Sequence, residues 1–274
     1  MSEGLMPYRL IALDLDGTLL NEELSVSPRV RGALERAAGT GARITLASGR
    51  GYPSMRRWVE DLGIVTPVIC YQGAVVTDTI THRGVYQRTI RRDIVGDVVA
   101  FARARDLSLT LYVADEIYVE RKRHPDAFYE KWFGLPFHVV EDLDSALPGE
   151  PVKFLIVGDE GELDALQPDA TAAFGDRLQI VRSHRYFLEG LRGDASKGQA
   201  LAWLARTLGI ARRDTMAIGD SGNDCAMIAW AGLGVAMGNA SDEAKAVADW
   251  IAPGIDEDGV AEAIERFCLD GACG

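Results

Sequence analysis

Two acids at the end of the first apolar run are the residues best suited to chemistry. If Tyr8–Leu15 is a strand, side chains two positions apart point the same way, so Asp14 and Asp16 project together from its carboxyl end. Gly17 then lets the backbone turn away. Two carboxylates this close hinder each other's ionisation, so the pair calls for a metal ion, a basic partner or a catalytic task.

A second acid pair follows another apolar run, in Ile218-Gly219-Asp220-Ser221-Gly222-Asn223-Asp224. A purely structural reading makes Asn223 a helix N-cap and Asp224 a first-turn residue that complements the helix dipole. A calcium loop of the EF-hand type does not fit the first acid pair, because the glycine and the final acid fall at the wrong positions. If Asp220 and Asp224 lie beside Asp14, their oxygen ligands favour Mg²⁺.

Two further segments offer groups that could meet a phosphate. Lys197 could neutralise the acids, although Ser196 and Gln199 also form a capping box that makes it an ordinary first-turn residue. Ser48-Gly49-Arg50 places a hydroxyl and free backbone N–H groups at a helix entrance, as phosphate binding requires. The alternative is a strand-ending turn with a surface arginine.

The elements that position these residues alternate between strand and helix. Residues 8–71 predict a βαβαβ unit, which is typical of a doubly wound parallel sheet whose ligands bind beyond the carboxyl ends of the strands. The pattern changes after Gly73, with short paired strands and an α+β segment, and the alternation resumes with a helix at Lys197. We therefore predict an α/β core of residues 1–83 and 187–274 and an inserted α+β domain of residues 84–186.

Composition excludes several classes of protein. The chain has 274 residues, 47% of them hydrophobic, with a formal net charge of −12 and no long basic run, which argues against nucleic-acid or membrane-surface partners. No apolar run is long enough to span a bilayer, and no secretory segment opens the chain. Four dispersed cysteines favour unpaired thiols, including Cys268 and Cys273, in a reducing cytoplasm. The motifs of P-loop, dinucleotide-binding, zincin and α/β-hydrolase proteins are absent from the sequence.

Taken in order, four segments of the chain resemble the motifs of the haloacid dehalogenase superfamily. They are Asp14-Leu15-Asp16-Gly17-Thr18-Leu19, Ser48-Gly49-Arg50, Lys197-Gly198 and Gly219-Asp220-Ser221-Gly222-Asn223-Asp224. The large insertion between the second and third segments resembles the Cof-type subfamily of sugar-phosphate and cofactor-phosphate phosphatases. This resemblance implies a Rossmann-like core with a cap domain that selects the substrate, and hydrolysis of small phosphorylated metabolites with Mg²⁺.

The resemblance also implies a role for each matching residue. Asp14 would attack phosphorus and become an aspartyl phosphate, while Asp16 would carry the proton and offer its backbone carbonyl to Mg²⁺. On that basis we expect Asp16 to hold its proton more tightly than Asp14. The remaining roles are phosphate binding by Ser48, Gly49, Lys197 and Asn223, metal binding by Asp14, Asp16, Asp220 and Asp224, and charge neutralisation by Lys197.

Substrate contacts are predicted at residues outside these motifs. Many relatives carry Asn-Gly-Ala where this chain has Gln72-Gly73-Ala74, so Gln72 is a candidate. Arg50 is another, and in the predicted cap Arg121 and Arg123 could meet an anionic leaving group while Tyr118 could stack on a ring. A solvated charged face is the alternative for the two cap arginines.

Two other functions fit the same motifs. A phosphotransferase or phosphomutase would pass the phosphoryl group from Asp14 to a sugar hydroxyl instead of water. A binding protein or sensor would keep the fold and the metal site without turnover. The sequence leaves the identity of the metabolite and the oligomeric state open.

Overall fold

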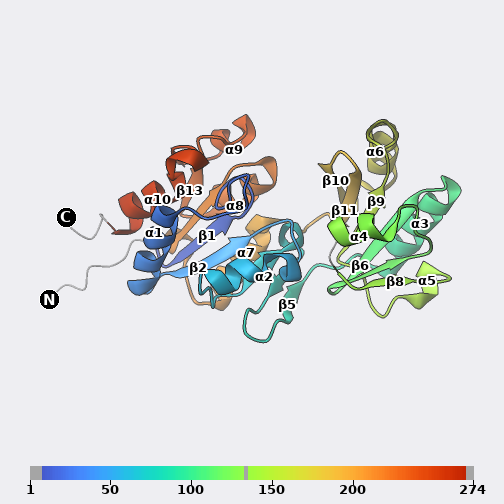
Figure 1. Ribbon diagram of the computed structural model, residues 1–274, viewed down its shortest axis with the longest axis horizontal. Helices are drawn as coiled ribbons and strands as arrows, with labels where there is room; N and C mark the ends of the chain where they lie inside the picture. Colours follow the sequence, from blue (N-terminus) through green and yellow to red (C-terminus); the bar gives the residue numbers. More distant parts are fainter. Residues whose placement is uncertain (1–7, 133–134, 270–274) are drawn as a thin grey trace. The chain divides into compact units, whose positions relative to one another are not determined.

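The computed structural model describes residues 8–132 and 135–269, which form two compact units (Figure 1). The first unit takes the residues up to Arg50, then Met55–Val85, then the residues from Ser196 on. The second takes Gly51–Ser54 and Tyr86–Ala195. Each unit has its own sheet, so the chain is an α/β protein with an inserted α+β unit.

An eight-stranded sheet forms the centre of the first unit, in the order β14-β13-β12-β1-β2-β3-β4-β5. Its strands are β1 (Leu10–Asp14), β2 (Arg43–Ala47), β3 (Val68–Cys70), β4 (Val75–Thr77), β5 (Gly84–Gln87), β12 (Thr215–Gly219), β13 (Leu233–Ala236) and β14 (Trp250–Ile251). Neighbouring strands from β14 to β3 run parallel, and β4 pairs antiparallel with β3. The predicted doubly wound sheet is confirmed.

Helices precede or follow these strands along the chain. They are α1 (Pro28–Gly39), α2 (Tyr52–Asp61), α7 (Lys197–Thr207), α8 (Cys225–Trp230), α9 (Asp242–Ala246) and α10 (Gly259–Ile264, continued as a π-helix to Leu269). Ser27 caps α1 by accepting a hydrogen bond from the backbone N–H of Val30, and Pro28 fills the first helical position, where its fixed φ favours a helix start.

Strand β1 lies where the sheet topology reverses. One of its two neighbours in the sheet, β2, is the next strand in the chain, and the other, β12, comes some 200 residues later. Every residue of β1 is buried, so the strand is held on both faces. A reversal of this kind leaves an opening beyond the carboxyl ends of the two strands, and Asp14 and Gly219 end those strands.

The second unit is built on a six-stranded sheet with the order β10-β11-β9-β6-β7-β8. Its elements are α3 (Arg92–Ala104), β6 (Ser108–Val113), β7 (Glu116–Val119), α4 (Asp126–Trp132), β8 (Phe137–Val139), α5 (Leu143–Ala146), β9 (Lys153–Val157), α6 (Glu160–Phe174), β10 (Leu178–His184) and β11 (Phe187–Arg192). All pairs are antiparallel except β7 with β8. The apolar sides of α3, α5 and α6 cover one face of this sheet.

Both predicted boundaries of the inserted unit are wrong by a few residues. Phe187–Arg192 was assigned to the core, but it forms β11 and pairs with β9 and β10, so the insertion ends at Ala195. Gly84 and Val85 were assigned to the insertion, but they belong to the first unit and begin β5 at the edge of the first sheet. A local strand pattern does not reveal which of two sheets a strand joins.

Among the described residues, Cys70, Cys225 and Cys268 form no disulfide bond. Cys273, the possible partner of Cys268, lies outside the described residues. Among the described helices, none combines the length and the apolar character that crossing a membrane demands.

Candidate functional site

A buried lysine joins two of the predicted acids. Lys197 is the first residue of α7, and its Nζ donates to Asp14 Oδ1 at 2.5 Å and to Asp224 Oδ1 at 2.6 Å. All three residues are buried, with Lys197 and Asp224 at 0% exposure. Three residues far apart in the sequence therefore meet at the end of β1 as an ion-paired triad.

Local sequence explains why Lys197 reaches this position. Ser196 caps α7 by accepting a hydrogen bond from the backbone N–H of Gln199 at 3.1 Å, so the capping interpretation and the proximity to the acids hold together. Gly198 lets α7 lie tightly against α8, because an added Cβ would come within 2.3 Å of the carbonyl oxygen of Ala226. The lysine is thus fixed by a cap on one side and close helix packing on the other.

The loop after β12 fixes the second acid pair. Asp224 Oδ2 accepts hydrogen bonds from the backbone N–H groups of Asp220 and Ser221, each at 3.0 Å. Thr18 donates to Asp220 Oδ1 at 3.1 Å, a contact that the sequence analysis missed although Thr18 directly follows the first acid motif. Gly17 makes room for Asp220, because a Cβ there would lie 2.6 Å from Asp220 Oδ2.

The carboxylates of Asp14, Asp220 and Asp224 offer oxygen atoms within 4.8 Å of one another. Burial raises the pKa of Asp14 to about 8 against the opposing effect of Lys197, and burial likewise raises the pKa of Asp220. Burial lowers the pKa of Lys197, but the charges of Asp14 and Asp224 outweigh it and leave that pKa raised.

Three carboxylates against one ammonium leave two negative charges in excess when all are ionised. Asp14 Oδ2 is also buried without a hydrogen-bond partner in the described structure. An uncompensated buried carboxylate oxygen is destabilising, so the cluster fits a divalent cation held by oxygen ligands.

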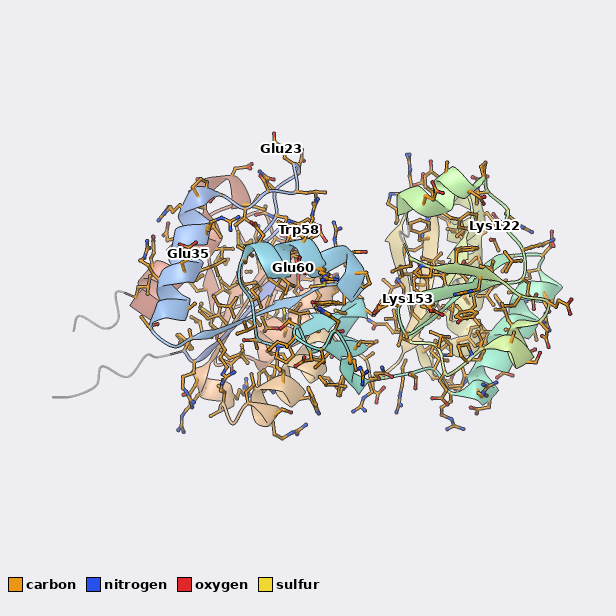
Figure 2. All side chains as sticks on the ribbon, turned by 60° about the horizontal axis from the view of Figure 1, so that its bottom comes forward. Glu23, Glu35, Trp58, Glu60, Lys122 and Lys153 are labelled. Atoms are coloured by element: carbon orange, nitrogen blue, oxygen red, sulfur yellow. The ribbon has the colours of Figure 1, made fainter. Side chains whose placement is uncertain are left out.

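Asp16 has a different partner. Its carboxylate receives two hydrogen bonds from the Arg50 guanidinium, from Nε at 2.8 Å and from Nη2 at 2.6 Å. The guanidinium also lies 5.2 Å from the ring centre of Trp58 on α2, which Figure 2 labels. The structure thus pairs Asp16 with an arginine and Asp14 with a lysine.

The Ser48-Gly49-Arg50 turn ends β2 and meets Gln72. Ser48 is buried, its Oγ accepts from the backbone N–H of Arg50 at 3.2 Å, and its carbonyl oxygen accepts from the backbone N–H of Gln72 at 3.1 Å. A Cβ at Gly49 would lie 2.4 Å from Gln72 Nε2, and Gln72 Oε1 is buried with no hydrogen-bond partner in the part of the chain that the structure describes. The side-chain amide of Gln72 therefore lies against the turn predicted to bind phosphate.

Three successive residues after β3 adopt left-handed backbone conformations. The φ angles are 50° at Tyr71, 56° at Gln72 and 93° at Gly73. Left-handed conformations strain residues that carry a Cβ, and such strain concentrates at functional sites. Only glycine fits at 73, because a Cβ would approach the carbonyl oxygen of Ser196 to 2.1 Å. The strained turn thus lies against Ser196, which caps α7 and directly precedes Lys197.

Two asparagines complete the surroundings. Asn223 is exposed and accepts a hydrogen bond from Ser221 Oγ at 2.8 Å. Asn239, which the sequence analysis did not select, donates from Nδ2 to the carbonyl oxygen of Gly17 at 2.8 Å and accepts from the backbone N–H of Ile255. It therefore braces the loop that carries Asp16.

A hollow of about 720 Å³ opens beside Asp16 in the first unit. Its lining includes Asp16, Glu22, Glu23 and Asp256, and no basic residue is among those that line it in the described structure. An anion is repelled by such a surface, so this hollow is poorly suited to binding phosphate.

The residues selected in the predicted cap all belong to the second unit. Arg121 and Arg123 both pair with Asp106, the latter at 2.7 Å. The Tyr118 ring stacks on His138 with centroids 4.8 Å apart, and its hydroxyl donates to Glu116 at 2.6 Å. These partners lie within the second unit, and substrate roles for the three residues stay predictions.

Comparison with known proteins places these observations in a family. Residues 11–264 match the haloacid dehalogenase-like hydrolases. The chain is 32% identical over 271 residues to YxeH of Bacillus subtilis, covering 96% of this chain and 99% of that one. It is 29% identical over 283 residues to the 5-amino-6-(5-phospho-D-ribitylamino)uracil phosphatase YwtE of the same organism, covering 94% and 98%.

A solved structure is also similar to this chain over most of its length. A haloacid dehalogenase-like hydrolase from Bacteroides thetaiotaomicron superposes with a TM-score of 0.82 at 34% identity, covering 94% of this chain and 99% of that one. The similarity therefore extends over both units.

Proposed function

Because this chain belongs to the haloacid dehalogenase-like hydrolases and is a phosphatase, we propose that it hydrolyses monoesters of small metabolites through an aspartyl phosphate on Asp14. The observation that carries this proposal is the buried contact of Lys197 with Asp14 and Asp224. This contact leaves one oxygen of Asp14 bound to an ammonium and the other without a hydrogen-bond partner among the described residues. A carboxylate so placed is held rigidly and is poorly neutralised, as a nucleophile for phosphorus requires.

We propose Mg²⁺ as the cation of the acidic cluster. Side-chain oxygens of Asp14, Asp220 and Asp224 would hold it, together with the backbone carbonyl of Asp16. When bound, it supplies positive charge that lets a phosphate dianion approach the carboxylates. The donor set contains oxygen atoms alone, which favours Mg²⁺ over the thiophilic metals.

Phosphate binding is assigned to groups around the same point. The Ser48 hydroxyl and the backbone N–H of Gly49 would donate to the phosphoryl oxygens, and Lys197 would neutralise them. The exposed Asn223 side chain would add a further donor. Donors fixed before the substrate arrives stabilise the charge that develops in the transition state, and this is where most of the rate enhancement would arise.

The reaction follows in two displacements. In the first, an Asp14 oxygen forms a bond to phosphorus while the bond to the ester oxygen breaks, and Asp16 gives that oxygen a proton. In the second, Asp16 takes a proton from water, whose oxygen attacks phosphorus and releases phosphate and free Asp14. Arg50 orients the Asp16 carboxylate for both proton transfers.

The substrate class follows from the relatives and from the second unit. The relative YwtE acts, by its name, on a phosphorylated ribityl compound. We propose that this chain takes small phosphorylated metabolites of the sugar-phosphate or cofactor-phosphate kind. The second unit would act as the cap that selects the leaving group, and the cytoplasm is the expected compartment.

Turnover of an aryl phosphate by the purified chain tests this proposal. With Mg²⁺ present, Asp14→Asn should abolish phosphate release, because an amide is a poor nucleophile toward phosphorus. Asp242→Asn is the matched control, since Asp242 is an exposed residue at the start of α9 in the same unit. Full activity of Asp14→Asn would refute the mechanism, and an isomeric sugar phosphate as product would indicate a mutase.

A further inference from the structure

One segment of the first unit is bonded to both loops that carry the acids. Residues 237–241 lie between β13 and α9, which Figure 1 labels. The backbone N–H of Ser241 donates to the carbonyl oxygen of Asp220 at 2.8 Å. The side-chain Nδ2 of Asn239 donates to the carbonyl oxygen of Gly17 at 2.8 Å. This segment therefore joins two acid loops that are far apart in the sequence.

Backbone hydrogen bonds fix the segment itself. The N–H of Met237 donates to the carbonyl oxygen of Gly219 at 3.0 Å, which continues the pairing of β12 with β13. The N–H of Gly238 donates to the carbonyl oxygen of Pro253 at 3.1 Å, in the loop after β14. The Asn239 side chain thus extends from a backbone that is held on two sides.

Asn239 uses both ends of its side-chain amide. While Nδ2 donates to Gly17, Oδ1 accepts from the backbone N–H of Ile255 at 3.0 Å. An amide carries a donor and an acceptor on one rigid plane, whereas a carboxylate offers acceptors alone. The residue is exposed, so it adds little to the apolar core. Its two hydrogen bonds are therefore its main contribution to the structure.

Gly17 is the point at which Asn239 acts on the loop of the first acids. Its φ is 86°, and its backbone N–H donates to the carbonyl oxygen of Leu20 at 3.1 Å. Glycine changes conformation at little cost, so these two hydrogen bonds, one on its N–H and one on its C=O, hold it in place. The N–H of Gly17 and the carbonyl of Asp16 share one planar peptide unit. The conformation of Gly17 therefore decides where the Asp16 carbonyl points.

We propose that Asn239 is a positioning residue that sets the affinity of the acidic cluster for Mg²⁺ by orienting the backbone carbonyl of Asp16. This proposal rests on the proposed Mg²⁺ site and adds a residue that touches neither the cation nor the substrate. Mg²⁺ demands nearly ideal octahedral geometry, so a carbonyl that points away from its place lowers the affinity. Residues that orient metal ligands typically change metal affinity by about 10- to 100-fold when they are replaced.

Asn239→Asp removes the donor and keeps the acceptor. The carboxylate can still accept from Ile255, but it cannot donate to the Gly17 carbonyl and repels it. Asn239 lines the hollow beside Asp16, so the added charge alone should strengthen Mg²⁺ binding by electrostatic attraction. The loss of positioning should instead weaken Mg²⁺ binding by about 10-fold. The two effects therefore have opposite signs.

Asn21→Asp is the matched control for the added charge. Asn21 lines the same hollow, and its Oδ1 accepts from the backbone N–H groups of Glu23 and Ser25, which an aspartate continues to do. Its affinity for Mg²⁺ should equal or exceed that of the wild type. Asn239→Ala removes both hydrogen bonds without adding charge, and it should weaken Mg²⁺ binding as well.

The rise of Tm with Mg²⁺ concentration gives the affinity of each intact variant without turnover. The Tm with a chelator reports stability alone, and it should change little in the Asn239 variants because the residue is exposed. Aryl phosphate turnover by these variants should be low at limiting Mg²⁺. It should return close to the wild-type rate at saturating Mg²⁺, since the proposed catalytic residues are intact.

Weaker Mg²⁺ binding by both Asn239 variants, with turnover restored by added Mg²⁺, supports the proposal. An Asn239→Ala affinity equal to that of the wild type overturns it, as does a loss of turnover that Mg²⁺ does not restore. In either case, wild-type turnover that depends on Mg²⁺ and Asp14 leaves the proposed function standing. Turnover by a wild type that does not bind Mg²⁺ overturns the cation site and this proposal together. A wild type that binds Mg²⁺ more tightly than both variants but hydrolyses no ester refutes the proposed function alone.

Discussion

Replacing Asp14 by asparagine should make the metal-free protein more stable at pH 8, although it removes the proposed nucleophile. Burial raises the pKa of Asp14 from its ordinary value of 3.8 to about 8. The folded state therefore binds a proton that the unfolded state releases, and the stability of the wild type falls as the pH rises from about 4 to about 8. Lys197 has a raised pKa, so its contribution does not change in this range.

The size of the effect follows from the same shift. Each pKa unit corresponds to about 1.4 kcal/mol, so ionised Asp14 destabilises the metal-free chain at pH 8 by at most about 5 kcal/mol. If removing the charge recovers half of this free energy, the Tm of Asp14→Asn should lie above that of the wild type by about 5–10 °C for a chain of this size. At pH 4 the difference should nearly vanish, because Asp14 is then protonated in the folded state.

Thermal unfolding of the wild type and Asp14→Asn, with a chelator at pH 4, 6 and 8, measures this difference. The control variant Asp242→Asn should have the same Tm as the wild type at every pH. Added Mg²⁺ should stabilise the wild type more than Asp14→Asn, since the variant loses a carboxylate ligand. A Tm of Asp14→Asn at or below that of the wild type at pH 8 with chelator would refute the electrostatic reasoning, as would a difference that does not depend on pH.

Three further substitutions test other parts of the site. Lys197→Met leaves two buried carboxylates without their ammonium, so it should lower the free energy of unfolding by about 3–5 kcal/mol at pH 8. It should also reduce aryl phosphate turnover at least about 10³-fold. A variant that is as stable as the wild type in a denaturant titration would contradict this. Arg50→Lys loses the paired hydrogen bonds that orient the neighbouring carboxylate, so kcat should fall about 10-fold with little change in KM. Arg57→Lys, which alters the other guanidinium over the same Trp ring, should leave kcat unchanged, and an equal loss in both would remove the orienting role. Gly73→Ala should abolish activity and lower the free energy of unfolding by more than Gly63→Ala does. Gly63 also has a positive φ but open space around it, so Gly63→Ala should lower the free energy of unfolding by about 1 kcal/mol. Equal unfolding midpoints of the two variants would show that the close approach at position 73 is unimportant.

Local sequence patterns were sufficient to predict the core of the site. Acids that follow apolar strands lie at the carboxyl ends of those strands whatever the rest of the fold does, so Asp14 and Asp220 could be placed from periodicity alone. Ser196 and Gln199 form a helix start that needs no distant partner, and it placed Lys197 correctly at the first turn of α7.

Contacts between distant segments could not be predicted in this way. The partner of Asp16, Arg50, is 34 positions away in the sequence, and it was predicted as a substrate contact and not as a partner of Asp16. Burial raises the pKa of Asp14, and this burial depends on how β1, β2 and β12 pack together. The end of the insertion was misplaced because a strand pattern does not say which sheet a strand joins, and β11 joins the second sheet by pairing with β9 and β10.

Chemical trapping of the phosphoryl-enzyme tests the central claim most directly. The wild type is mixed with a rapidly hydrolysed monoester, quenched during turnover and treated with borohydride, which reduces an aspartyl phosphate to homoserine. Mass spectrometry of the peptide that contains residues 14 and 16 then locates the change. We predict homoserine at position 14, with Asp16 intact, and no modification in Asp14→Asn. Homoserine at another position, or an unmodified Asp14 under conditions of turnover, would contradict the account.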